Sequence, residues 1–515
     1  MDVLKSFYRK VPKNVWICFA SGLVFGVIVH LYMLTHKLPN WDDLNNFHGF
    51  GSGIEYGRWL LQYLRPLTGE WSIPAFNGMV GIILWTIAAC FIYLAMNMKT
   101  VTGAILTPLM VISFPAVAST MNYMFTVTCY AMGFLFVCIG VYLYRRYKYG
   151  FIPAFLLFVL SLGVYQSYIC LAAGMLVMGF VRDAMQEESS FQKVLRDGIK
   201  SLITLAATLL SYVIISKVLF PHLTTDRGLD TMGQVNILQL PRLVMRCYKR
   251  ILEYFVIKPY SFTSPFSQAV NIAVCIMIVV LLIWVLIDRK IYKDKAKTVL
   301  IIVLMLVEPL ALASIYILAP ETQDATLMML HQYFFVYIVA IVLMEQIRTT
   351  EEAQKKRLKG ILYGITAAAI MLVGYRNYLV TNEAYFRVSI AVDRASAYYN
   401  RIVMNIESQE GYQYGDQISI LGEFYPDPNP LAQPSYDADR FTEFSGMAME
   451  NGLLTTGSRK GFLQTYMGIY YEKVTDAEND AIKETEEYKA MPIYPAGGSI
   501  KRINNVWVVK VHDEE

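Results

Sequence analysis

Apolar runs long enough to cross a bilayer as helices recur along this chain, and they limit the possible folds more than any other feature does. The first run extends roughly from Val15 to Met33. A helix needs about 20 apolar residues to cross the hydrocarbon core of a bilayer. We therefore predict an all-α polytopic membrane protein with about 11 transmembrane helices. The expected spans cover approximately residues 15–34, 74–96, 100–118, 122–144, 150–164, 166–182, 199–219, 269–287, 298–318, 326–346 and 360–379.

The composition agrees with this class and also divides the chain. Of the 515 residues, 55% are hydrophobic and only 17% are charged, whereas soluble proteins carry about 25% charged residues. The apolar runs stop near residue 380, and charged and turn residues become common after it. We expect a transmembrane domain over residues 1–380 and a small α/β domain outside the membrane over 381–515. In the second domain, 382–408 is predicted to be a helix, and Gln417–Gly422 and Asn505–Val511 are predicted to be strands.

Lysine and arginine are unevenly divided between the loops. Four cations precede the first span, and alternate loops after it are rich in Lys and Arg. The opposite short loops hold only Lys37, Arg58 and Arg65. Because cytoplasmic loops carry the excess of Lys and Arg, the N-terminus is expected in the cytoplasm. Eleven spans then place the C-terminal domain outside the plasma membrane.

Several functional classes are not expected. The net charge of +4 comes from short loops between spans, and no basic stretch with interleaved aromatic residues indicates a nucleic-acid surface. The seven cysteines lack the spacing of a zinc site, and phosphate-loop, dinucleotide and serine-hydrolase motifs are missing. Asp42, Asp43 and His48 could hold a divalent cation, but nothing fixes their geometry, so no metal or other cofactor is expected.

Two adjacent carboxylates, Asp42 and Asp43, follow the first span directly. They could simply end a helix and face water, or one could be a general base at the outer membrane interface. Neighbouring side chains point in different directions, which favours unequal roles. Arg58, in the Gly57-Arg58-Trp59 run, is either a membrane anchor or a phosphate ligand, since guanidinium matches phosphate geometry.

A second external segment runs from Pro221 to about Gln268 and is too long for a plain connection. Within it, Leu238–Val256 has apolar residues at helical spacing beside Arg242 and Arg246. This pattern predicts a helix in the membrane interface, with its basic side chains toward the headgroups.

Polar residues also occur where spans are expected to turn or to be buried. Tyr165-Gln166-Ser167-Tyr168 lies at a tight external connection, where it could satisfy backbone groups or bind sugar hydroxyls. His30, Glu308 and His331 lie inside expected spans, and ionisable groups there are functional candidates because they are costly to bury. His331 is near the outer end of its span, which permits a contact with phosphate.

Together these motifs resemble the type II Gtr glucosyltransferases, which are membrane enzymes of the GT-C class. The motifs that carry the resemblance are Asp42-Asp43, Gly57-Arg58-Trp59, Pro74, Tyr165-Gln166-Ser167, Arg227-Gly228-Leu229-Asp230-Thr231, Met491-Pro492-Ile493-Tyr494-Pro495, Gly498-Ser499-Ile500 and Val508-Val509-Lys510. They span nearly the whole chain, and their order and placement matter more than any one of them. One departure is that the tenth span begins with His331 where such families lead us to expect an arginine.

The resemblance implies transfer of a hexose, typically glucose, from a polyprenyl-phosphate-linked donor to a cell-surface glycan on the outer face. It implies a GT-C-like fold. We expect Asp42 or Asp43 to be the base, Arg58, Arg242, Arg246 and His331 to contact the donor phosphate, and Tyr165, Gln166 and Asp230 to contact the substrate. A phosphate leaving group needs a cation rather than a strong acid, which agrees with this set.

Two other classes stay open. A flippase or other carrier of lipid-linked sugar would keep its polar residues at mid-membrane on broken helices and often has repeated halves. Here the polar motifs gather on the outside and no repeat is visible. A scaffold, in which the C-terminal domain binds partners and the Asp pair is inert, is the third possibility.

Overall fold

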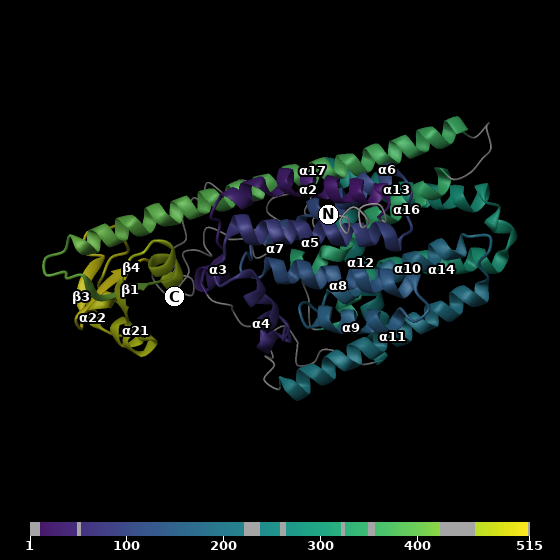
Figure 1. The fold of residues 1–515 in the computed structure, drawn as a ribbon. Coiled ribbons are helices and arrows are strands. Elements are labelled where there is room, and N and C mark those ends of the chain that lie inside the picture. The colour runs from purple at the N-terminus through teal and green to yellow at the C-terminus, as the bar shows by residue number, and fades with distance from the viewer. Residues whose placement is uncertain are drawn as a thin grey trace, which may run out of the picture.

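The computed structural model describes residues 11–48, 53–220, 237–257, 264–320, 325–348, 356–422 and 459–512. It is 75% helical, with a helical bundle and a small sheet near the C-terminus. Figure 1 shows the sheet domain beyond one end of the bundle, joined to it by the long helix α17 (Lys356–Glu407). The predicted class, a helical membrane protein with a small α/β C-terminal part, is confirmed at this level.

Helices cover all of the predicted spans, but not all of these helices are long enough to cross a membrane. In the described residues, seven are long and apolar enough, or eight if one bent pair forms a single span. The seven are Lys13–Thr35 (α2), Pro74–Ala95 (α5), Val127–Arg146 (α8), Phe191–Leu219 (α11), Pro265–Asp288 (α13), Leu327–Ile347 (η6, Leu327–Phe334, and most of α16, Phe335–Arg348) and Arg357–Glu407 (in α17). The bent pair is α6 (Val101–Ser113) and α7 (Pro115–Met121), which meet at 48°.

The count of about 11 spans is therefore not confirmed. Helix α9 (Phe151–Leu162) has only 12 residues and is about 18 Å long, well short of a hydrocarbon core of about 30 Å. Helix α10 (Tyr168–Ala184) has 17 residues. Helix α14 (Lys295–Leu312) has 18 residues but carries two lysines and a glutamate. Apolar sequence marks these helices but does not determine how far each one extends through a bilayer.

Short elements gather where α2 ends and α5 begins. They are α3 (Trp41–Asn46), η1 (Ile54–Tyr56), α4 (Leu61–Leu64) and η2 (Arg65–Thr68). In Figure 1, α3 and α4 lie on the side of the bundle nearest the sheet domain. Elsewhere are η4 (Ile237–Gln239), α12 (Leu240–Phe255), η5 (Ile291–Lys293), α15 (Ile315–Leu318) and η6 (Leu327–Phe334). The basic helix predicted over Leu238–Val256 corresponds to α12.

Helix α17 joins the two parts without a break. Its 52 residues make it about 78 Å long, far longer than a membrane core. It includes both the last predicted span and the helix predicted over 382–408. Inside the bundle, His30 on α2 contacts both α17 and α6. Its Nδ1 is 2.8 Å from the Tyr385 hydroxyl on α17, and its Nε2 is 3.1 Å from the Ile112 carbonyl oxygen on α6. His30 therefore has a structural role that joins α2, α6 and α17.

The C-terminal sheet has the order β2-β1-β4-β3. Its strands are β1 (Gly415–Leu421), β2 (Tyr471–Lys473), β3 (Ile500–Ile503) and β4 (Val506–Lys510). β1 is parallel to β2 and β4, whereas β3 and β4 form a hairpin. Asn504 and Asn505 have φ angles of 49° and 67°, as a tight hairpin turn requires. β1 and β4 match the two predicted strands.

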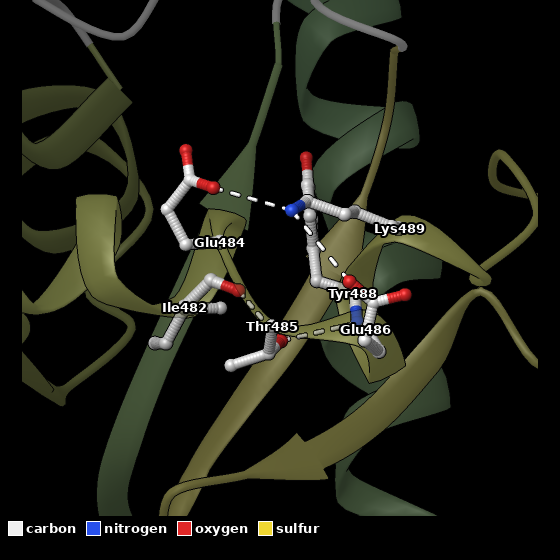
Figure 2. Close-up of polar contacts among 6 residues, drawn as sticks. All are labelled: Ile482, Glu484, Thr485, Glu486, Tyr488 and Lys489. Carbon is white, nitrogen blue, oxygen red and sulfur yellow. Dashed lines mark hydrogen bonds and ion pairs between the residues drawn. The ribbon is translucent and has the colours of Figure 1, made fainter.

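Two short helices, α21 (Asp476–Lys483) and α22 (Glu486–Lys489), follow β2. Figure 2 shows how Thr485 joins them: its hydroxyl donates to the Ile482 carbonyl at 2.7 Å and accepts the Tyr488 N–H at 3.2 Å. Lys489 pairs with Glu484 at 3.2 Å and with Glu486 at 3.8 Å. Such exposed pairs contribute about 0–1 kcal/mol, so the threonine cap determines this turn.

Candidate functional site

The two adjacent carboxylates occupy different environments. Asn40 caps α3 by accepting the backbone N–H groups of Asp42 and Asp43, each at 2.8 Å. This cap turns the Asp42 side chain to the surface and the Asp43 side chain into the protein, where it is 1% exposed. The two side chains point in different directions, as their adjacency led us to expect, and the unequal roles stay a prediction.

The buried carboxylate of Asp43 binds the connection between α7 and α8. Oδ1 accepts the Phe125 N–H at 3.2 Å and Oδ2 accepts the Met124 N–H at 3.4 Å. Burial raises the pKa of Asp43 to about 7, although these N–H groups act in the opposite direction. A carboxylate that titrates near neutral pH is suited to accept a proton at that pH.

Arg58 lies in the same segment between α2 and α5, among tyrosine rings. Its Nη1 donates to the Tyr130 hydroxyl at 2.9 Å, and its guanidinium is 5.0 Å from the centre of the Tyr165 ring and 5.7 Å from that of Tyr56. No carboxylate lies within 4.0 Å of this guanidinium in the part of the chain that the structure describes. Its charge is therefore available to an anionic ligand.

Gln166 and Tyr212 hold the turn that presents Arg58. The Gln166 side-chain amide donates to the Tyr56 carbonyl at 2.6 Å and contacts the Tyr212 hydroxyl at 2.9 Å, which donates to the Gly57 carbonyl at 3.1 Å. Gly57 has a φ of 69°, and a Cβ there would overlap the Tyr212 hydroxyl. Gln166 therefore satisfies a backbone carbonyl group, which is one of its two predicted roles, and its contact with sugar hydroxyls stays a prediction. Tyr165 is buried against Arg58, so both residues lie at this site.

Arg65 belongs to the same group, although the sequence distinguishes it only as a loop cation. It is fully buried, and its Nη1 donates to the Gly69 carbonyl at 2.6 Å. The Thr68 hydroxyl, three residues on, is 3.2 Å from that of Thr128 in the first turn of α8. In the sequence, the one feature that could have pointed to Arg65 is its position in a loop with few cations.

His331 lies deeper, in an aromatic box. Its ring stacks on Phe134 with centroids 4.5 Å apart, and the rings of Phe114 and Tyr168 lie at 6.3 and 6.4 Å. It is fully buried. Tyr165 and Tyr168, 5.3 Å apart, connect it to the Arg58 site.

The other predicted site residues lie apart from this group or outside the described residues. Arg242 is exposed on α12, and Arg246 on the same helix donates to the Pro320 carbonyl at 2.8 Å. Within the described ranges, no hydrogen bond or ion pair joins either one to Arg58 or Asp43. Asp230 lies outside the residues that the structure describes.

The C-terminal domain reaches the Asp-bearing segment through Tyr466, at the end of the π-helical turn η9 (Gly461–Tyr466). The Tyr466 ring stacks on Phe47 with centroids 6.1 Å apart, and Lys37 Nζ is 3.9 Å from its centre. Arg459, just before this turn, donates to the carbonyl groups of Ile420 and Gly422 and so ties the turn to β1. The sequence did not predict this contact, because Lys37 and Tyr466 are 429 positions apart.

The residues considered for a cation do not form a metal centre. His48 Nε2 pairs with Glu70 at 3.3 Å, whereas the Asp43 carboxylate faces backbone N–H groups. Among the described residues, no three His, Cys, Asp or Glu side chains gather as metal ligands would.

Comparison with known proteins identifies the family. The model of a family described as Glucosyl transferase GtrII matches residues 31–344, which include every predicted site residue from Asp42 to His331. The C-terminal domain lies beyond this match. No curated protein and no solved structure gives a significant match. Because the match covers more than half of a chain with several membrane-length helices, the protein belongs to the GtrII glucosyltransferase family and is a membrane glycosyltransferase.

Proposed function

We propose that the protein transfers glucose from a polyprenyl-phosphate donor to a cell-surface glycan, on the outer face of the plasma membrane and with inversion at the anomeric carbon. Asp43 carries the proposal. It is a buried carboxylate with a pKa near 7, in the short helix α3 that follows the membrane-length helix α2. Arg58, which lies in the same segment between α2 and α5, has no carboxylate partner among the described residues.

In the proposed reaction, the Asp43 carboxylate accepts the proton of an acceptor hydroxyl. The acceptor oxygen attacks the anomeric carbon, and the bond from that carbon to the phosphate oxygen breaks. Polyprenyl phosphate leaves with the electron pair of that bond. Arg58 stabilises the phosphate, since its guanidinium presents several donors and a permanent positive charge. No cofactor takes part.

The remaining predicted residues have supporting roles in this proposal. Tyr165 keeps Arg58 in place, and Gln166 holds the turn before it. Arg242 and Arg246 face lipid headgroups or a donor lying in the interface, which suits the amphipathic character of α12. Two further contacts stay predictions: that of His331 with the phosphate and that of Asp230 with the substrate.

The outer-face orientation rests on the loop charges. The segment with Asp43 and the C-terminal domain meet at Tyr466 and so lie at one end of the bundle. The loops of the other end carry Lys99, Arg145 and Arg289. By the positive-inside bias, that second end faces the cytoplasm.

A carrier of lipid-linked sugar is the second candidate function. The 48° break between α6 and α7 favours it, because transporters bind substrates at broken helices. An assay on the protein reconstituted in vesicles distinguishes the transferase from the carrier. With labelled polyprenyl-phosphoglucose and a surface glycan, a transferase makes a new glycosidic bond and a carrier only moves label across the vesicle.

A further inference from the structure

Arg65 is held in an unusual environment for an arginine. It begins η2, is followed by Pro66, and its Nη1 folds back onto the Gly69 carbonyl at 2.6 Å. No part of the residue reaches solvent. The 3.2 Å contact between Thr68 and Thr128 fixes η2 against the first turn of α8. The guanidinium is therefore positioned by the fold.

Among the described residues, two of the three guanidinium nitrogens have nothing to bind. Nε and Nη2 are buried and have no hydrogen-bond partner there, and no carboxylate of these residues lies within 4.0 Å. An unsatisfied buried donor costs about 1–3 kcal/mol, and a buried charge without a counter-ion costs more. A fold that keeps both donors free is explained most simply by an anionic ligand.

The surroundings of Arg65 indicate where that anion lies. The Asp43 carboxylate and the Cys129 thiol act electrostatically on Arg65, so the cation is near the proposed base without touching it. Asp43 is occupied on one side by the N–H groups of Met124 and Phe125. Tyr130, the residue after Cys129, binds Arg58. Asp43, Arg58 and Arg65 thus gather around the first turn of α8.

We propose that Arg65 is a phosphate ligand of the transfer site, which binds the lipid phosphate through Nε and Nη2. This inference rests on the proposed function. A hexose-linked polyprenyl phosphate is a diester with one negative charge, and transfer releases a monoester whose second ionisation has a pKa near 6. A second cation therefore binds the released phosphate more tightly than the donor, and it stabilises the charge that develops as the bond breaks.

The test measures binding rather than turnover. Full-length protein in lipid nanodiscs is titrated with a C55 polyprenyl phosphate and with the matching C55 polyprenol. Wild type is expected to prefer the phosphate. Arg65→Gln is expected to bind the phosphate about 10- to 100-fold more weakly, because its charge-assisted hydrogen bonds to the phosphate are lost. Its affinity for the alcohol is expected to stay the same, because the alcohol makes no such bonds. The matched control is Arg289→Gln, which is expected to bind both lipids like wild type. Arg289 directly follows α13 and donates to the Gln346 carbonyl.

A folded Arg65→Gln protein with unchanged phosphate preference overturns the proposal. If Arg65→Gln does not fold, Arg65→Lys decides, since it keeps the charge but loses the planar donors. A reduced phosphate preference in Arg65→Lys supports the assignment, and an unchanged one refutes it. Glucose transfer by wild type is measured separately, and its absence refutes the proposed function. If wild type is active but the Arg65 variants keep the wild-type phosphate preference, only this inference is refuted.

Discussion

The Asp43 carboxylate accepts the backbone N–H of Phe125 at 3.2 Å, although the two residues are 82 positions apart. This bond joins the short helix α3 to the connection that enters α8. Tyr130 in the first turn of α8 binds Arg58 at 2.9 Å. The proposed base and the proposed phosphate ligand are therefore held by residues of one short segment, Met124 to Tyr130, and a shift in either is expected to affect the other.

The first prediction concerns the two carboxylates. Asp43→Asn is expected to lower the rate of glucose transfer by about 10²- to 10⁴-fold, because removal of a positioned base has costs of this size. Asp42→Asn is expected to change the rate only a few-fold, since Asp42 is exposed. The rate is measured on reconstituted protein, and gel filtration establishes that each variant folds. Equal loss of activity in both variants would contradict the assignment of Asp43.

The second prediction concerns pH. The base must be ionised, so transfer by wild type is expected to rise with pH around a midpoint near 7, the pKa of Asp43. The same shift has a consequence for stability. The folded pKa lies above the ordinary value of 3.8, so the proton is held more tightly in the folded state. This contribution is present at low pH and is lost as pH rises from about 4 to about 7.

The comparison with Asp43→Asn isolates this titration from all other groups. The difference in free energy of unfolding between wild type and variant is expected to vary with pH in this window and to be constant above it. A difference that does not change with pH would mean that Asp43 has an ordinary pKa.

The third prediction concerns the turn before Arg58. Gly57→Ala is expected to displace Arg58, because its Cβ would overlap the Tyr212 hydroxyl at a φ of 69°. We expect a loss of at least about 1 kcal/mol of stability and a higher KM for the donor. Gly411→Ala, in the C-terminal domain, has a similar φ of 85° but is not in contact with the proposed phosphate ligands, and its Cβ would meet nothing closer than 3.8 Å, so it serves as the control for backbone strain alone. A KM that rises equally in both variants would exclude a specific role for the Gly57 turn.

The hydrophobic pattern predicted the helices well but not their extent. Long apolar runs correspond to α2, α5 and α13, whereas α9 has only 12 residues and ends before Gly163. Hydropathy registers burial in protein and burial in lipid alike, so an apolar run by itself does not establish that a helix crosses the membrane. The sheet strands were predictable because β1 and β4 are short β-branched runs beside turn residues.

The site was predictable only in part, since its key relations are tertiary. The sequence singled out Asp42, Asp43 and Arg58 but could not say which aspartate is buried. That depends on the Asn40 cap and on the α7–α8 connection. Arg65 was missed because only its burial and unused donors distinguish it from an ordinary loop cation.

The fourth prediction concerns the C-terminal domain. Tyr466→Ala is expected to weaken its contact with Phe47 and Lys37 and so to loosen the segment that carries Asp43. We expect a several-fold lower kcat and faster hydrogen exchange in residues 37–47. Tyr470→Ala removes a largely exposed tyrosine of the same domain that stacks on Tyr414, and it is expected to leave both readouts unchanged. If Tyr466→Ala also changes neither readout, the domain does not support the site.

The fifth prediction concerns a buried ion pair between α13 and α17. Lys359 Nζ lies 3.1 Å from the Asp288 carboxylate, and the two side chains are 7% and 6% exposed. Lys359→Met is expected to lower stability by about 3–5 kcal/mol, because it removes the lysine from a buried ion pair while the buried carboxylate stays. The double variant Lys359→Met/Asp288→Leu is expected to recover most of this loss. A double variant as unstable as the single one would show that the charge pairing is not the cause.

The central claim is that Asp43 activates an acceptor hydroxyl against a prenyl-linked glucose. Its most direct test is the pH dependence of glucose transfer from polyprenyl-phosphoglucose, measured in parallel for reconstituted wild-type, Asp42→Asn and Asp43→Asn proteins. The account predicts a rise centred near pH 7 in wild type and Asp42→Asn, and a small residual rate without that rise in Asp43→Asn. Wild-type rates and the same pH profile in Asp43→Asn would contradict it.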